Sequence, residues 1–125
     1  MRLAVKLNHL DLQVPDVQRS VQFFERYFNF EMCSNRSSPA VAVMEDRHGL
    51  VLVLQRLKNP AEKYPEGFHI GFYVEDEALV HEVQAKARAD GHEVSDIIRN
   101  NRGTMLYFKA PGDLLVEVNC RPRAA

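Results

Sequence analysis

The sequence predicts an α+β fold made of two similar βαβββ modules, and two observations lead to this prediction. First, the segment His9-Leu-Asp-Leu-Gln-Val has a counterpart in His69-Ile-Gly-Phe-Tyr-Val, and an Asp follows each His by seven residues. Second, an amphipathic helical pattern follows each segment, and three short strand patterns follow each helix. A repeated strand–helix unit of this kind indicates two structural halves related by approximate symmetry.

The first module is expected at residues 5–57. Polar and apolar side chains alternate at its start, which predicts a strand with one buried face. Asp16 is suited to cap the helix that follows, and Asn29 stands where a left-handed C-cap residue belongs. The elements expected here are a strand at 7–14, a helix at 17–28, and strands near 30–36, 40–46 and 50–57.

The second module is expected at residues 67–121, after a polar linker at 58–66. Asp76 is suited to cap its helix and Gly91 to end it, with Leu79, Val83 and Ala87 facing inward. The elements expected here are a strand at 68–74, a helix that runs to Asp90, and strands near 92–99, 103–109 and 114–120. A chain of 125 residues is the size of one ordinary domain, so we expect a single domain over 1–125.

Titratable side chains gather on the strand faces opposite the apolar ones. His9 and Asp11 share such a face in the first module, and His69, Tyr73 and Glu117 do so in the second. Polar groups on the inner surface of a sheet are costly unless they are paired or bind something. If the equivalent strands of the two halves lie side by side, the two histidines converge, and two convergent imidazoles are half of a metal site.

The composition excludes several functional classes. The net charge of −1 gives no electrostatic reason to expect a nucleic acid or an anionic membrane as partner. No apolar run is long enough to span a bilayer, and the start of the chain does not resemble a signal peptide, so we expect a cytoplasmic protein. Cys33 and Cys120 lack metal-type spacing and are expected to be buried free thiols.

Four motifs give the chain a resemblance to a known family over essentially its whole length. They are Asn8-His-Leu-Asp-Leu-Gln-Val-Pro-Asp16, Phe23-Phe24 with Phe28-Asn-Phe30, His69-Ile-Gly-Phe-Tyr-Val74, and Tyr107-Phe-Lys-Ala-Pro-Gly-Asp-Leu-Leu-Val-Glu117. In this order and spacing the motifs resemble the vicinal oxygen chelate superfamily. Its members include glyoxalase I, fosfomycin and bleomycin resistance proteins, and extradiol dioxygenases.

The resemblance implies two βαβββ modules whose curved mixed sheets pair around a metal-binding cleft, usually in a homodimer. It implies that His9, His69 and Glu117 occupy the metal-ligand positions and hold a divalent ion such as Fe, Mn, Ni or Zn. The substrate would be a small molecule chelated through two adjacent oxygens, with the ion acting as a Lewis acid. The implied activity is that of a lyase, an isomerase or a ring-cleaving dioxygenase.

The resemblance also has limits. Glyoxalase I has a further Glu ligand on the fourth strand of its first module, where Val53 stands here, and Gln55 could replace it only with a register shift. Glu117 and Tyr73 are the candidate catalytic residues. For Tyr73 and Tyr107, acid–base or substrate-orienting roles compete with simple packing, which is the preferred interpretation. The alternative functions are a metal-free antibiotic-binding module and a fosfomycin-type thiol transferase.

Overall fold

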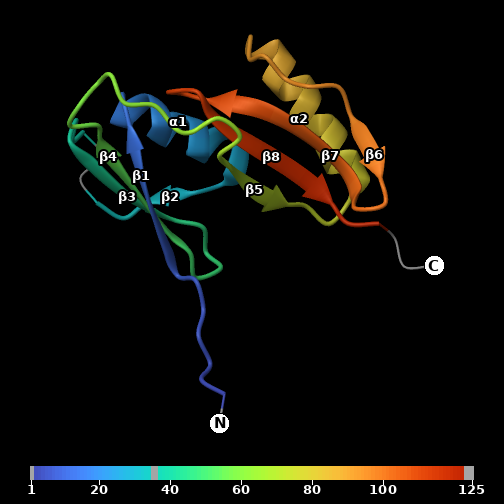
Figure 1. Ribbon diagram of the computed structural model, residues 1–125, viewed down its shortest axis with the longest axis horizontal. Helices are drawn as coiled ribbons and strands as arrows, with labels where there is room; N and C mark the ends of the chain where they lie inside the picture. The colour runs from blue at the N-terminus through green and yellow to red at the C-terminus, as the bar shows by residue number, and fades with distance from the viewer. Residues whose placement is uncertain (1, 35–36, 123–125) are drawn as a thin grey trace. The chain divides into compact units, whose positions relative to one another are not determined.

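The structure is a computed structural model that describes residues 2–34 and 37–122. The order of its elements confirms the βαβββ pattern twice over (Figure 1). The elements are β1 (His9–Val14), α1 (Val17–Phe28), β2 (Glu31–Met32), β3 (Val41–Glu45), β4 (Val51–Arg56), β5 (His69–Tyr73), α2 (Glu77–Ala89), β6 (Ile98–Asn100), β7 (Gly103–Ala110) and β8 (Leu114–Cys120). The strand expected near 30–36 is reduced to two residues, and positions 35 and 36 lie outside the described residues.

The chain divides into two compact units, residues 1–62 and 63–125, and each contains one four-stranded sheet. We call the βαβββ part of the first unit module 1 and that of the second unit module 2. The strand order is β1-β4-β3-β2 in module 1 and β5-β8-β7-β6 in module 2. The first strand of each module pairs in parallel with the last, and the other pairings are antiparallel. Both sheets are therefore mixed, and their topologies are the same.

Helix α1 has the ends that the sequence predicts. The Asp16 carboxylate accepts a hydrogen bond from the backbone N–H of Arg19 at 3.1 Å, and Asn29 adopts the left-handed conformation with φ 57°. The helix packs on β3 and β4 through a stripe that includes the buried Val21 and Phe24. Because Asn tolerates a positive φ better than most residues, it ends this helix without a glycine.

Helix α2 corrects one prediction about its inward face. Leu79 is 39% exposed, whereas Val80 and Ala87 are fully buried. The inward stripe consists of Val80, Val83, Gln84 and Ala87, which follows the helical repeat of 3.6 residues per turn. The predicted set was spaced by four residues at each step, so its first member, Leu79, lies off this face. Gln84 made the stripe hard to recognise in the sequence, because it is polar and yet faces inward. Its amide donates a hydrogen bond to the backbone oxygen of Ser95 at 3.0 Å.

Alternation along the strands places the core on one face of each sheet. Leu12 and Val14 are buried in module 1, as are Val116 and Val118 in module 2, and the residues between them are more exposed. Cys120 is a buried free thiol as predicted, but the free thiol of Cys33, which directly follows β2, is exposed. Neither described helix has the length and apolar character needed to cross a membrane.

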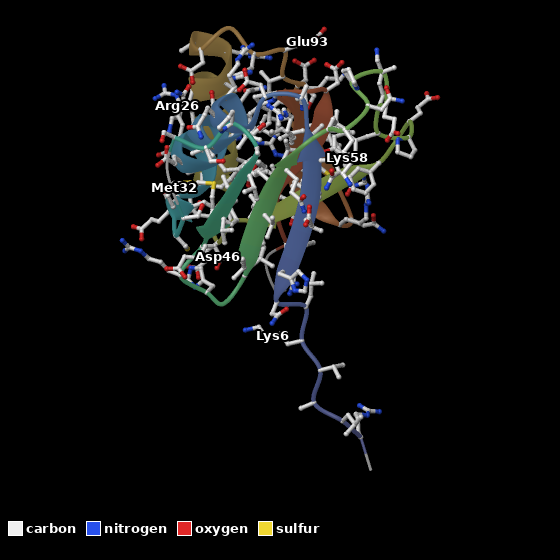
Figure 2. The ribbon with its side chains drawn as sticks, turned by 90° about the vertical axis from the view of Figure 1, so that its left-hand side faces the viewer. Lys6, Arg26, Met32, Asp46, Lys58 and Glu93 are labelled. Carbon is white, nitrogen blue, oxygen red and sulfur yellow. The ribbon has the colours of Figure 1, made fainter. Side chains whose placement is uncertain are left out.

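The start of β1 lies beside the β3–β4 turn in module 1. Figure 2 shows Lys6 and Asp46 at the same end of this sheet. The ammonium group of Lys6 lies 3.5 Å from the backbone oxygen of His48, within the same turn. Asp46 organises the turn itself, because its carboxylate accepts hydrogen bonds from the backbone N–H groups of His48 and Leu50.

Gly103 is expected to be indispensable for the pairing of β7 with β8. Its φ is +123°, and a Cβ there would lie 2.0 Å from the backbone oxygen of Cys120. Gly103→Ala should therefore lower the free energy of unfolding by more than about 3 kcal/mol, as measured by urea denaturation. Gly91→Ala is the matched control, because Gly91 also has a positive φ but a Cβ there has open space. The control should cost about 1–2 kcal/mol, and equal losses in both variants would contradict the prediction.

Candidate functional site

Strands β5 and β8 bring His69 and Glu117 together on the exposed face of module 2. Within the parallel pair, His69 lies opposite Leu115 and Gly71 lies opposite Glu117. The Nε2 atom of His69 is 4.0 Å from Oε1 of Glu117. A cation that binds both atoms requires only small side-chain rotations, since imidazole nitrogens and carboxylate oxygens bind such ions at about 2.0–2.2 Å.

Both candidate histidines have Nδ1 engaged in a hydrogen bond. In His69, Nδ1 lies 2.9 Å from the backbone oxygen of Gly67, which can only accept, so Nδ1 carries the proton. In His9, Nδ1 lies 2.8 Å from the side-chain oxygen of Asn8 and donates to it. In a histidine tautomer with the proton on Nδ1, the free electron pair is on Nε2. Fixing the tautomer through the other ring nitrogen is the usual way in which proteins prepare a histidine for a metal.

The Glu117 carboxylate is satisfied by neighbours within module 2. Its Oε1 accepts a short hydrogen bond from the hydroxyl of Tyr107, and its Oε2 accepts one from the amide of Asn119 at 2.8 Å. The side chain is 15% exposed. An unliganded carboxylate at this position is therefore not costly, and burial of Glu117 gives no support for metal binding.

Tyr107 was expected to be a packing residue, but in the structure it contacts both site residues of module 2. It lies directly opposite Glu117 in the β7–β8 pair, and its ring packs edge-on against His69 with centroids 5.8 Å apart. The hydrogen bond to Glu117, burial and the negative charge of Glu117 raise the pKa of the phenol. Tyr107 is therefore a hydrogen-bond donor at neutral pH. The signal in the sequence was its parity, which is opposite to that of the buried Leu106 and Phe108.

Tyr73 occupies a different environment. Its side chain is 56% exposed, and the guanidinium of Arg121 lies over its ring at 5.3 Å. It lines a pocket of about 300 Å³ that also includes Glu77 and Thr104. The interaction with Arg121 is a cation–π contact on the module surface. A catalytic role for Tyr73 stays a prediction.

Module 1 repeats the geometry of this face with different residues. His9 lies opposite Val51 and Asp11 lies opposite Val53, as His69 and Gly71 lie opposite Leu115 and Glu117 in module 2. Val53 is thus the structural counterpart of Glu117. The two carboxylate oxygens of Asp11 accept hydrogen bonds from the side-chain amides of Gln13 and Gln55, at 3.0 and 2.5 Å.

The predicted set of three metal ligands draws on both modules. His69 and Glu117 come together within module 2, and His9 lies on β1 of module 1. Within neither module do the described residues gather three His, Cys, Asp or Glu side chains in a metal-binding arrangement. The donor types of these three side chains suit a divalent ion, because two imidazoles and one carboxylate are the ligand set of a facial triad.

Comparisons with known proteins agree with this architecture. The profile of the "Glyoxalase/Bleomycin resistance protein/Dioxygenase superfamily" matches residues 6–118. Among solved structures, a possible glyoxalase from Bacillus cereus is similar with 34% identity and a TM-score of 0.83, over 94% of this chain and 100% of that one. A search of curated proteins finds no significant match.

Two more distant structures share the fold. One is a variant of the fosfomycin resistance protein FosX from Listeria monocytogenes, complexed with Mn(II) and 1S,2S-dihydroxypropylphosphonic acid. It has 21% identity and a TM-score of 0.78, over 96% of this chain and 93% of that one. The other is lactoylglutathione lyase from Agrobacterium tumefaciens, with 20% identity and a TM-score of 0.73, over 94% and 95%. At these identities the similarity shows the fold.

Glu117→Gln should lower the pKa of the Tyr107 phenol toward the ordinary tyrosine value of about 10. The reason is that a neutral amide removes the charge and weakens the accepted hydrogen bond, which together hold the proton on the phenol. An alkaline titration of tyrosinate absorbance measures this pKa. The same titration of Tyr107→Phe, alone and combined with Glu117→Gln, isolates the signal of Tyr107 from those of the other tyrosines. An unchanged or higher phenol pKa in Glu117→Gln would contradict the assignment.

Proposed function

Because this chain belongs to the glyoxalase/bleomycin resistance protein/dioxygenase superfamily, we propose that it is a divalent-metal-dependent enzyme. Its substrate would be a small molecule chelated through two adjacent oxygens. The observation that carries the proposal is the pair in module 2, where Nε2 of His69 lies 4.0 Å from Oε1 of Glu117 while Nδ1 of the same ring donates to the backbone oxygen of Gly67. Among lyase, isomerase and dioxygenase chemistry, the 34% identity to a possible glyoxalase favours a glyoxalase-type reaction.

The proposed ligands are His9, His69 and Glu117. The hydrogen bonds at Nδ1 of both histidines support this choice, because they leave Nε2 as the donor atom in each ring. The ligand types suit Fe, Mn, Ni or Zn, and metal identity then depends on geometry and supply. FosX, which has the same fold, was solved with Mn(II).

When bound, the ion would supply Lewis acidity toward the two substrate oxygens. The remaining chemistry falls to the side chains around it. Tyr107 keeps its proton at neutral pH and donates it in a hydrogen bond to Oε1 of Glu117. Asn119 holds the second oxygen of Glu117 and so fixes the orientation of the carboxylate. We propose Glu117 as both ligand and proton acceptor, and Tyr73 as a second candidate for contact with the substrate.

A metal-free ligand-binding module, such as an antibiotic-binding resistance protein, is the second candidate function. The observation in its favour is that Tyr107 and Asn119 satisfy both oxygens of Glu117 without an ion. A small ligand would then raise the thermal stability of the protein in the absence of metal. A fosfomycin-type thiol transferase is a variant that rests on the shared fold with FosX.

A homodimer belongs to the proposal as well, and sedimentation equilibrium would test it.

Elemental analysis of protein purified without chelator or affinity-tag metal tests the main proposal. We expect about one divalent ion per chain in the wild type. The triple variant His9→Ala, His69→Ala, Glu117→Ala should contain none, because every proposed ligand is removed. A matched control triple, His48→Ala, His81→Ala, Glu82→Ala, removes the same residue types at exposed positions outside the site and should retain the ion.

The contradicting result is wild-type protein without metal, whose stability and turnover do not respond to added divalent ions. Hemithioacetals formed from glutathione and 2-oxoaldehydes are the first substrates to assay, because they present two adjacent oxygens to the ion. Ligand-dependent thermal stabilisation without metal would then make the binding module the better proposal.

A further inference from the structure

Arg102 lies in the tight turn between β6 and β7, at the edge of the module 2 sheet (Figure 1). Asn100 lies opposite Gly103 in the β6–β7 pair, so Asn101 and Arg102 form the connection. The backbone N–H of Arg102 donates a hydrogen bond to the side-chain oxygen of Asn100 at 2.8 Å. The turn therefore fixes the point from which this long, exposed side chain extends.

The guanidinium of Arg102 lies over the face of the sheet that carries Glu117. Its Nη2 atom is 3.9 Å from the sulfur of Met105. In the β7–β8 pair, Met105 lies opposite Asn119, and the next pair on the same face is Tyr107 with Glu117. Met105 is only 2% exposed although it stands on this polar face. Arg102 therefore folds back along the sheet, beside the candidate site of module 2.

The positive charge of Arg102 has no acidic partner of its own. Among residues 2–34 and 37–122, no carboxylate lies within ion-pair distance of its guanidinium. By contrast, Nη2 of Arg99, in the neighbouring strand β6, lies 2.6 Å from Oε1 of Glu77. The hydrogen bond to Glu117, burial and the charge of Glu117 raise the pKa of the Tyr107 phenol, and the nearby charge of Arg102 acts in the opposite direction. The hairpin thus holds one arginine in an ion pair and leaves the other beside the site.

We infer that Arg102 binds a carboxylate of the substrate, and that the substrate is therefore anionic. The inference rests on the proposed function, since the chelated oxygens of the substrate lie beside His69 and Glu117. A guanidinium presents a planar fork of N–H donors and a single positive charge, which matches a planar, singly charged carboxylate. Met105, which Arg102 covers, is one same-face pair further along the strands than Glu117. Two residues of a strand span about 7 Å, so the substrate carboxylate lies about that far from the chelated oxygens.

Two hydroxamates of equal length test the inference by binding rather than by turnover. Hydroxamates chelate divalent ions through two adjacent oxygens, as the proposed substrate does. Glutaric acid monohydroxamate ends in a carboxylate, and pentanohydroxamate ends in a methyl group at the same position. In calorimetric titrations of protein loaded with Mn(II), the carboxylate probe should bind about tenfold more tightly than the methyl probe. This preference should shrink as salt is added, because Arg102 is exposed.

Arg102→Gln should abolish the preference and leave the affinity for pentanohydroxamate unchanged, because the methyl probe does not use the guanidinium. Arg102→Lys should keep part of the preference, since it retains the charge but lacks the planar fork. Arg99→Gln is the matched control on the same hairpin, and it should keep the full preference because Arg99 is engaged by Glu77. Equal weakening of both probes in Arg102→Gln would overturn the inference, because Arg102 would then act only by supporting the hairpin. Thermal melting of each variant confirms that folded proteins are compared.

Failure of the inference is distinguishable from failure of the proposed function. If neither hydroxamate binds the wild-type protein more tightly with Mn(II) than without it, both are overturned. If both probes need the ion but bind with equal affinity, or if the preference survives in Arg102→Gln, the role of Arg102 is overturned and the metal-dependent site stands.

Discussion

The parallel pairing of the first strand of each module with the last is the constraint on which the rest of the structure depends. It fixes which residues of β1 face β4 and which of β5 face β8, and a slip of one residue would turn every side chain to the other face. The buried leucines and valines hold this register, because they have only one face on which to pack against α1 or α2. The position of His69 relative to Glu117 is thus a consequence of hydrophobic packing on the opposite side of the sheet.

The polar face is organised by short-range hydrogen bonds. Nδ1 of His69 donates to a backbone oxygen two residues earlier, and Asn119 donates to the carboxylate two residues earlier. Such contacts cost little additional conformational entropy, because the strand already sets the spacing of their partners. The strand geometry therefore supplies most of the preorganisation that a binding site on this face requires, before any ligand arrives.

Local patterns in the sequence predicted most of the fold. The span of α1, the caps at Asp16 and Asp76, and the alternation of β8 follow from rules that involve only neighbours in the chain. The inward face of α2 was not predictable in this way, because Gln84 is polar and yet inward, with its partner in a distant loop. Cys33 was expected to be buried, but it directly follows β2 and is exposed. The role of Tyr107 beside Glu117 likewise depends on a strand register that spacing along the chain does not contain.

The hydrogen bond between Tyr107 and Glu117 gives the protein an intrinsic spectroscopic probe. The acidity of the phenol depends on the negative charge of its acceptor, so any event that neutralises this charge makes the phenol more acidic. Protonation of the carboxylate and capture of a cation by it are both such events. The ultraviolet absorbance of tyrosinate at a fixed alkaline pH thus reports the charge state of one half-buried carboxylate, with no added dye or label.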